Sequence, residues 1–307
     1  GVFAQWYRMG HILGAAAIRL EIDDKVIVFS GDIGRYNVPI LVDPSPVPMG
    51  DLLLIESTYG DRNHADSSPQ DSLAAIVNKT AARGGVVVIP SFAVGRAQLL
   101  LYYLRELKEN KLIPDIPVIV DSPMATDATN IYRKHESDYD EAALKIVESS
   151  RQPFDLPKLG FITERQASQR LNKIKEPMII ISASGMLTGG RILHHLKHRI
   201  SEPENSIVFV GYQPPGGRGD WIQRGAQSLR LFGHETPINA EVGTISGLSA
   251  HADKDELHRW CESANQKPGK VAVVHGEPDS AQTFSESLRQ QYQWDTSVPQ
   301  YLEELTL

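Results

Sequence analysis

The 307-residue sequence contains almost no cysteine, no long apolar run and no excess of basic residues. Its single cysteine, Cys261, excludes an intrachain disulfide framework and is typical of a reducing compartment, which predicts a cytoplasmic protein. No apolar stretch approaches the roughly 18 residues that a membrane helix needs, so we expect no membrane partner. The net charge of -7 argues against unspecific nucleic-acid binding but leaves a local basic channel open.

Two carboxylates stand where short apolar runs end. Asp32 follows the run Val26–Phe29, and Glu56 follows the run Leu52–Ile55. Runs this short and this β-branched are buried strands more often than helices. Because α/β proteins bind ligands outside the carboxyl ends of their strands, both acids are candidates for one site. Judged alone, Asp32 could merely cap a turn in S-G-D-I-G, and Glu56 could be a surface acid.

Three histidines occupy comparable positions. His11 precedes an apolar run, His251 follows the expected strand Glu241–Ile245, and His275 ends the expected strand Val271–Val274. Imidazole and carboxylate are ligands that a hydrolytic metal such as zinc accepts. A lone histidine in such a place is usually a core residue or a hydrogen-bonding group. The case for a metal site therefore depends on these histidines and the two acids lying together.

Between these stretches the sequence alternates strands with helices. Four apolar runs lead into polar loops, and in the first three a helix is expected next: Val86–Ile89, Val118–Val120, Met178–Ile181 and Ile207–Val210. This alternation predicts an α/β fold with a mostly parallel sheet. The charged, proline-interrupted stretch from 139 to 170 predicts a helical cap. Near the start, residues 12–22 and 25–30 predict a hairpin.

Seven short motifs follow one another along the chain. They are G-H-I-L-G-A at His11, S-G-D-I-G at Asp32, E-S-T-Y-G at Glu56, P-S-F-A-V-G-R-A-Q, S-G-M-L-T-G-G-R, S-A-H-A-D at His251 and V-V-H-G-E at His275. Together they resemble the β-CASP branch of the metallo-β-lactamase fold. The pattern is most similar to the RNA-cleaving members, which include bacterial and archaeal ribonucleases and the endonuclease subunit of the cleavage and polyadenylation machinery.

This resemblance covers essentially the whole chain and implies a two-domain architecture. Residues 1–60 and 245–307 would form part of a metallo-β-lactamase αββα sandwich. Residues 61–244 would form an inserted β-CASP α/β domain. The active site would lie between the two domains, and RNA would be the substrate.

The resemblance also implies a role for each residue. His11, Asp32 and His275 would bind metal, with Asp32 bridging two zinc ions that activate water and neutralise phosphate charge. His275 favours RNA, because the DNA-processing branch has a non-ligand at this position. His251 would protonate the leaving oxygen, and Glu56 would hold its ring through a carboxylate–histidine hydrogen bond.

Substrate-binding residues are expected around the glycine-containing loops, where backbone N–H groups suit phosphate oxygens. The candidates are Arg96, Ser184, Arg191, Arg218 and Ser249. For the three arginines, a solvated or structural role is an equal alternative. His194, His195 and His198 lack metal-ligand spacing, so we expect them on a helix surface or in a substrate groove. Tyr212 and Trp221 could stack on a base, but the sequence favours core packing.

One departure from the family pattern is the absence of H-x-H-x-D-H, the signature that supplies most zinc ligands. Gly1 is no initiator methionine and the first residues open in mid-pattern, so we expect the chain to begin after that signature. His11, Asp32 and His275 are too few for two zinc ions with four ligands each.

The sequence thus predicts a zinc-dependent RNA phosphodiester hydrolase that acts in RNA processing or decay. One alternative is a catalytically inactive RNA-binding subunit of a processing complex, and another is a DNA-processing nuclease. The sequence does not distinguish endonuclease from exonuclease action. It also leaves the RNA target and the oligomeric state open, with a homodimer as one alternative.

Overall fold

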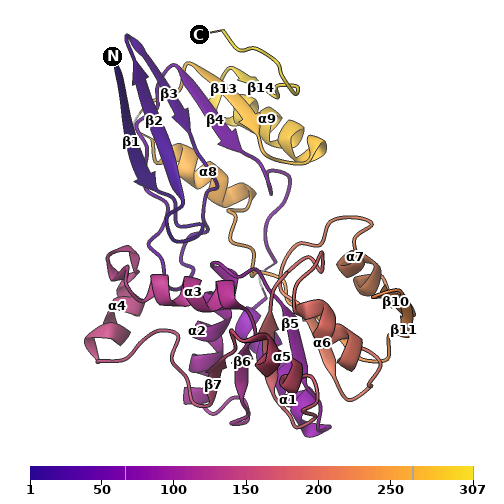
Figure 1. Ribbon diagram of the computed structural model, residues 1–307. Coiled ribbons are helices and arrows are strands. Elements are labelled where there is room, and N and C mark those ends of the chain that lie inside the picture. Colours follow the sequence, from indigo (N-terminus) through magenta and orange to yellow (C-terminus); the bar gives the residue numbers. More distant parts are fainter. Residues whose placement is uncertain (66, 265, 307) are drawn as a thin grey trace. The chain divides into compact units, whose positions relative to one another are not determined.

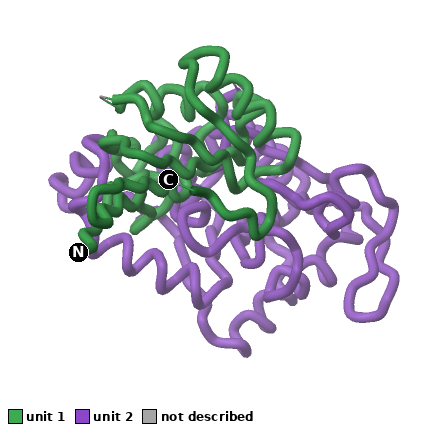
Figure 2. The backbone as a smooth tube through the Cα atoms, turned by 90° about the horizontal axis from the view of Figure 1, so that it is seen from above, with its two compact units in different colours: residues 1–64, 250–307 green, residues 65–249 purple. Residues whose placement is uncertain are grey.

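The computed structural model describes residues 1–65, 67–264 and 266–306, and the chain divides into two units. Unit 1 comprises residues 1–64 and 250–307, and unit 2 comprises residues 65–249 (Figures 1 and 2). The division lies a few residues later than the domain boundaries expected from the sequence. Each unit has its own sheet and its own apolar core.

Unit 1 is built on one sheet of six strands. In spatial order they are β1 (Val2–Arg8), β2 (Ala16–Ile22), β3 (Lys25–Phe29), β4 (Leu52–Glu56), β13 (Lys270–Val274) and β14 (Thr296–Ser297). Strands β1, β2 and β3 run antiparallel and include the predicted hairpin, whereas β3, β4, β13 and β14 run parallel. The carboxyl ends of β3, β4 and β13 therefore share one edge of the sheet, and the residues that follow them meet there.

Two helices pack against this sheet, α8 (Lys254–Glu262) and α9 (Pro278–Tyr292). Trp260 of α8 and Phe284 of α9 are fully buried in a core that also contains Ile55 of β4. Burying an apolar side chain of this size stabilises the fold by roughly 1.5–3 kcal/mol. This core holds the strands rigidly beneath the loops that leave the sheet edge.

Helix α8 begins with a capping box. Asp253 Oδ1 accepts a hydrogen bond from the backbone N–H of Glu256, and Glu256 Oε2 accepts one from the backbone N–H of Asp253, both at 3.0 Å. Such a box satisfies two backbone donors that the helix itself leaves unpaired. Asp253 is thus the N-cap residue of α8. The loop that carries His251 is thus attached directly to a well-defined helix start.

Unit 2 contains a second sheet of six strands, all parallel to their neighbours. In spatial order they are β12 (Glu241–Thr244), β9 (Ser206–Phe209), β5 (Val87–Pro90), β8 (Ile179–Ser182), β6 (Val118–Val120) and β7 (Leu159–Phe161). The two central strands, β5 and β8, are completely buried. The predicted α/β fold with a parallel sheet is confirmed.

Helices alternate with these strands, as the sequence predicts. They are α1 (Pro69–Ala82), α2 (Arg96–Glu109), α3 (Pro123–Tyr132), the 3-10 helix η1 (Glu136–Asp138), α4 (Glu141–Glu148), α5 (Arg165–Leu171), α6 (Ile192–Arg199) and α7 (Arg218–Gln223). No helix in the described ranges is long and apolar enough to cross a membrane.

Some elements differ from the expectation. The stretch predicted as a helical cap contains α4 and α5 but also the edge strand β7, so that prediction is wrong in part. Three residues are too few to show a strand period in a sequence, and pairing with β6 is what holds them extended. The hairpin of β10 (Ser228–Leu231) and β11 (His234–Pro237) was also missed, as were β1 and β14.

Candidate metal centre and catalytic pair

Isolated β-bridges join three loops of unit 1, those that carry His11, Asp32 and His251. Gly10 and Ile33 form one antiparallel bridge, and Gly34 and His251 form another. The N–H of Gly34 donates to the carbonyl of Met9 at 2.7 Å, and that of Ala252 to Ile33 at 2.8 Å. These bridges bring His11, Asp32 and His251 together, although the third lies more than 200 positions along the chain from the others.

Close approach of the first two loops requires a glycine at position 34. A Cβ atom there would lie 2.3 Å from the carbonyl carbon of Gly10 and 2.5 Å from the backbone N of His11. Real Cβ atoms do not approach backbone atoms this closely, so any other residue would push the loops apart. The glycine that closes S-G-D-I-G thus sets the separation of His11 and Asp32.

The remaining two residues come from adjacent parallel strands. Glu56 is the last residue of β4 and lies opposite Val274 of β13, so His275 follows at the same edge. The backbone of His275 is left-handed, with φ of 51°, and its carbonyl accepts from Ser57 N–H at 3.3 Å and from the Thr58 hydroxyl at 3.3 Å. These bonds hold the end of β13 against the start of the loop after β4.

Asp32 turns its two carboxylate oxygens toward two different histidines. Oδ2 lies 3.6 Å from Nε2 of His11, and Oδ1 lies 3.5 Å from Nδ1 of His275. Both separations exceed an ordinary hydrogen bond. Burial and the adjacent His251 lower the pKa of His11, against the opposing effect of Asp32. His11 is therefore neutral at neutral pH, the form that binds metal.

His251 and Glu56 form a pair beside this group. Nδ1 of His251 lies 3.1 Å from both carboxylate oxygens of Glu56, which is 1% exposed. Glu56 also accepts from the backbone N–H of Ile33 at 2.5 Å and of Thr58 at 3.4 Å. The carboxylate is fixed from three directions and, as an acceptor, favours an N–H on Nδ1 of the ring. The ring centroid of His251 is 4.3 Å from that of His11.

The side chains present fit part of a zinc site. Donor atoms of His11, Asp32 and His251 all lie within 4.8 Å of one another, and His275 approaches Asp32 from another side. Nitrogen and carboxylate oxygen are the donors that zinc accepts, but this set alone does not complete two four-coordinate ions. The geometry also places His251 near enough to bind metal, so its assignment as an acid stays a prediction.

The predicted substrate-binding residues lie in unit 2, and the three arginines among them all have protein partners. Arg96 donates to the carbonyl of Val210, and Arg218 donates to that of Leu187 at 2.9 Å. Arg191 donates to Asp121 at 2.8 Å and to the carbonyls of Ile162 and Thr163. A structural role thus accounts for each guanidinium, and contact with RNA stays a prediction.

The two predicted serines differ in their surroundings. Ser184 Oγ accepts from the backbone N–H of Thr188 at 3.1 Å, within the loop after β8. Ser249 is partly buried at the end of unit 2. For both, contact with substrate stays a prediction.

Sequence reasoning missed a buried cluster in unit 2. His195, expected on a helix surface or in a groove, is fully buried, with Nε2 2.6 Å from Asp121. Asp121 directly follows an apolar strand, and Asp32 comes three residues after one, so that position could have identified Asp121. Tyr212 and Trp221, expected in the core, are 45% and 54% exposed, so core packing is the wrong interpretation for both.

Comparison with known proteins agrees with this architecture. Residues 97–222 match the family described as the Beta-Casp domain, and residues 235–299 match the Zn-dependent metallo-hydrolase RNA specificity domain. An RNase J-like protein of Methanocaldococcus jannaschii is 33% identical over 299 residues, which are 96% of this chain and 68% of that protein. The chain belongs to the β-CASP family of the metallo-β-lactamase fold. Membership of this family implies a metal cofactor.

Other relatives have a similar sequence identity to this chain. A ribonuclease of Thermus thermophilus is 38% identical over 288 residues, 90% of this chain and 65% of the relative. A transcription termination factor of Methanosarcina mazei is 30% identical, covering 98% of this chain and 49% of its own length. The chain thus spans between half and about two thirds of the relatives that it matches. A crystal structure of a protein of unknown function from Enterococcus faecalis shares the fold, with a TM-score of 0.52 at 10% identity over 97% of this chain and 62% of that one.

Proposed function

We propose that this chain carries part of the active site of a zinc-dependent ribonuclease that hydrolyses RNA phosphodiesters in RNA processing or decay. The arrangement of Asp32 supports the proposal most strongly, because its two oxygens face His11 and His275 while the His251–Glu56 pair lies alongside. Metal-ligand donors next to a carboxylate-held imidazole are what phosphodiester hydrolysis needs.

His11, Asp32 and His275 would hold the metal. When bound, zinc would neutralise phosphate charge and make water a better nucleophile at neutral pH. The protein itself contributes the fixed separation of the loops, which Gly34 permits, and the neutral state of His11. Two zinc ions need more ligands than these three residues provide, and H-x-H-x-D-H is absent from the sequence.

His251 would supply the proton to the leaving oxygen. In its imidazolium form, the ring would donate Nδ1–H to the Glu56 carboxylate, which orients it, and would give the Nε2 proton to the leaving oxygen, becoming neutral. An alkoxide is a poor leaving group unless it is protonated, so such a proton transfer typically increases the reaction rate 10²–10⁴-fold. RNA is the proposed substrate, because the relatives include named ribonucleases and the matched RNA specificity domain spans both histidines 251 and 275.

Cleavage of single-stranded RNA tests the proposal. The protein should be produced from the full reading frame that encodes these residues, stripped with a chelator, and assayed before and after zinc is restored. We expect RNA to be cut only when zinc is present, and a DNA strand of the same base order to stay intact. Equal cleavage with and without zinc, or preferential cleavage of the DNA, would contradict the proposal. No cleavage by the zinc-loaded protein would favour the inactive RNA-binding alternative.

A further inference from the structure

His64 touches the backbone of His251 from outside the proposed catalytic set. Nε2 of His64 lies 3.0 Å from the carbonyl oxygen of His251. On its other side, His251 bridges Gly34, and the next residue, Ala252, donates to Ile33. The backbone of His251 is therefore held from two sides, and on one of them the His64 side chain makes the contact.

His64 is itself held firmly. Its backbone N–H donates to Oδ2 of Asp253 at 3.0 Å, so it is attached to the cap of helix α8. Its ring meets the edge of Tyr59 at 4.6 Å between centroids, and Arg62 stacks over Tyr59 at 4.8 Å. Burial lowers the pKa of His64, so the ring is neutral near pH 7 and carries one proton. That proton lies on Nε2, because a carbonyl can only accept.

A metal ion is the rival explanation for this cluster, since donor atoms of His64, Asp253 and Glu256 lie within 4.8 Å of one another. Each carboxylate oxygen already has a protein donor. Asp253 accepts from the backbone of Glu256 and of His64. Glu256 accepts from the backbone of Asp253 and of Tyr36 and from the side chain of Arg35. The cluster is a satisfied hydrogen-bond network.

We propose that His64 is a positioning residue, whose Nε2–H holds the His251 carbonyl and thereby keeps the His251 ring on Glu56. The role follows from the short path between them, because a shift of the His251 backbone moves its ring relative to a carboxylate that two backbone N–H groups also fix. This inference rests on the proposed function for its effect on catalysis, but its structural part can be tested without activity.

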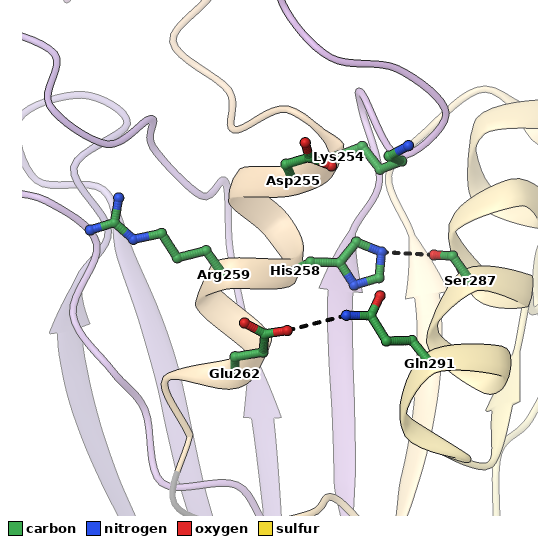
Figure 3. Close-up of a pocket in the computed structure, with 7 residues that line it drawn as sticks. All are labelled: Lys254, Asp255, His258, Arg259, Glu262, Ser287 and Gln291. Carbon is green, nitrogen blue, oxygen red and sulfur yellow. Dashed lines mark hydrogen bonds between the residues drawn. The ribbon is translucent and has the colours of Figure 1, made fainter.

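Three substitutions of His64 distinguish the effect of losing its hydrogen bond from the effect of losing its ring. His64→Leu removes the donor at similar volume. His64→Gln keeps it, because the glutamine amide reaches about as far as Nε2, and His64→Asn carries an amide that is too short. The matched control is His258→Gln. His258 also lies in unit 1 and is buried, whereas His64 is half-buried. Its ring nitrogens bond Ser287 and Tyr292 beside a pocket of about 390 Å³ between α8 and α9 (Figure 3).

The first measurement is the ring tautomer of His251 by ¹⁵N NMR of the metal-free protein, assigned from the signal that His251→Ala removes. At a pH where the His251 ring is neutral, we expect Nδ1–H alone in the wild type, in His64→Gln and in His258→Gln. His64→Leu and His64→Asn should show both tautomers in exchange. An unchanged His251 signal in the Leu and Asn variants would overturn the proposal. Should His64→Leu fail to fold, the Asn–Gln comparison decides alone.

The second measurement is RNA hydrolysis by the zinc-loaded protein. We expect kcat of His64→Leu to fall about tenfold, KM to stay within about twofold, and His64→Gln to keep most of the activity, because one positioning hydrogen bond acts on the transition state. Equal losses in the Leu and Gln variants, or loss of a bound zinc in His64→Leu, would overturn the proposal. If the wild type cuts no RNA, the proposed function fails, while the NMR result still decides the positioning role.

Discussion

Nδ1 of His251 lies 3.1 Å from each carboxylate oxygen of Glu56, and Glu56 is almost completely buried. An ionised group in such a place is costly unless it is hydrogen-bonded. Two backbone N–H groups and the imidazole satisfy it. The positions of Glu56 and His251 are therefore fixed relative to each other, and the carboxylate sets the tautomer and the orientation of the ring.

Glu56→Gln should abolish the function of the Glu56–His251 pair while preserving the size of the side chain. The amide oxygen still accepts from the backbone N–H of Ile33, but N–H donors replace the second oxygen that faces the ring, and the neutral amide no longer stabilises the protonated imidazole. We expect RNA cleavage to fall by about 100-fold and the free energy of unfolding to fall by roughly 1–3 kcal/mol. Steady-state kinetics and denaturant unfolding measure these effects.

Glu21→Gln is the control for that substitution, since Glu21 is a partly exposed acid on β2 whose side chain is 45% accessible. It should change neither quantity appreciably. Cleavage by Glu56→Gln within about threefold of the wild type would mean that the carboxylate does not orient the acid.

Asp32→Asn should weaken metal binding. An amide oxygen is a poorer ligand than a carboxylate, and Asp32 is the residue that both His11 and His275 face. We expect zinc affinity to fall at least about tenfold, measured by competition with a chromogenic chelator. Asp24→Asn, in the exposed turn between β2 and β3, should bind zinc as the wild type does. Equal affinities for the two variants would remove Asp32 from the metal site.

The buried cluster of unit 2 should make stability depend on pH. Burial lowers the pKa of His195. As the pH falls, the His195 imidazole is therefore protonated in the unfolded chain before it is protonated in the folded chain. Its stabilising contribution is complete above the unfolded pKa of about 6.5 and is lost as the pH falls below it. His195→Gln should therefore flatten the pH dependence between about pH 7 and 5, read from hydrogen exchange of the β8 amides.

His135→Gln is the control for the pH measurement, because His135 is exposed after α3. The stability of His195→Gln will still depend on pH, since burial also lowers the pKa of His11, His64 and His258. Identical slopes in the wild type and His195→Gln would show that His195 does not titrate with folding. Asp121 contributes only at lower pH. Burial raises its pKa, but hydrogen bonds from His195, Ser168 and Arg191 outweigh that effect and lower it.

The alternation of strands and helices could be predicted because buried parallel strands such as β5 and β8 are short apolar runs. The site residues could be named because they follow such runs or stand in motifs. Strand β7 could not be predicted, because only its pairing makes it a strand. The contacts of His64 with His251 and of His195 with Asp121 join residues 187 and 74 positions apart, and no local pattern encodes them.

Substitution of His251 by alanine tests the division of the site into metal ligands and a proton donor most directly. Zinc content and RNA cleavage should be measured on the same preparation. The account predicts that His251→Ala loses cleavage by at least about 100-fold while its zinc content matches that of the wild type. A matching loss of zinc would show that His251 is a ligand, and undiminished cleavage would show that the proton comes from another group.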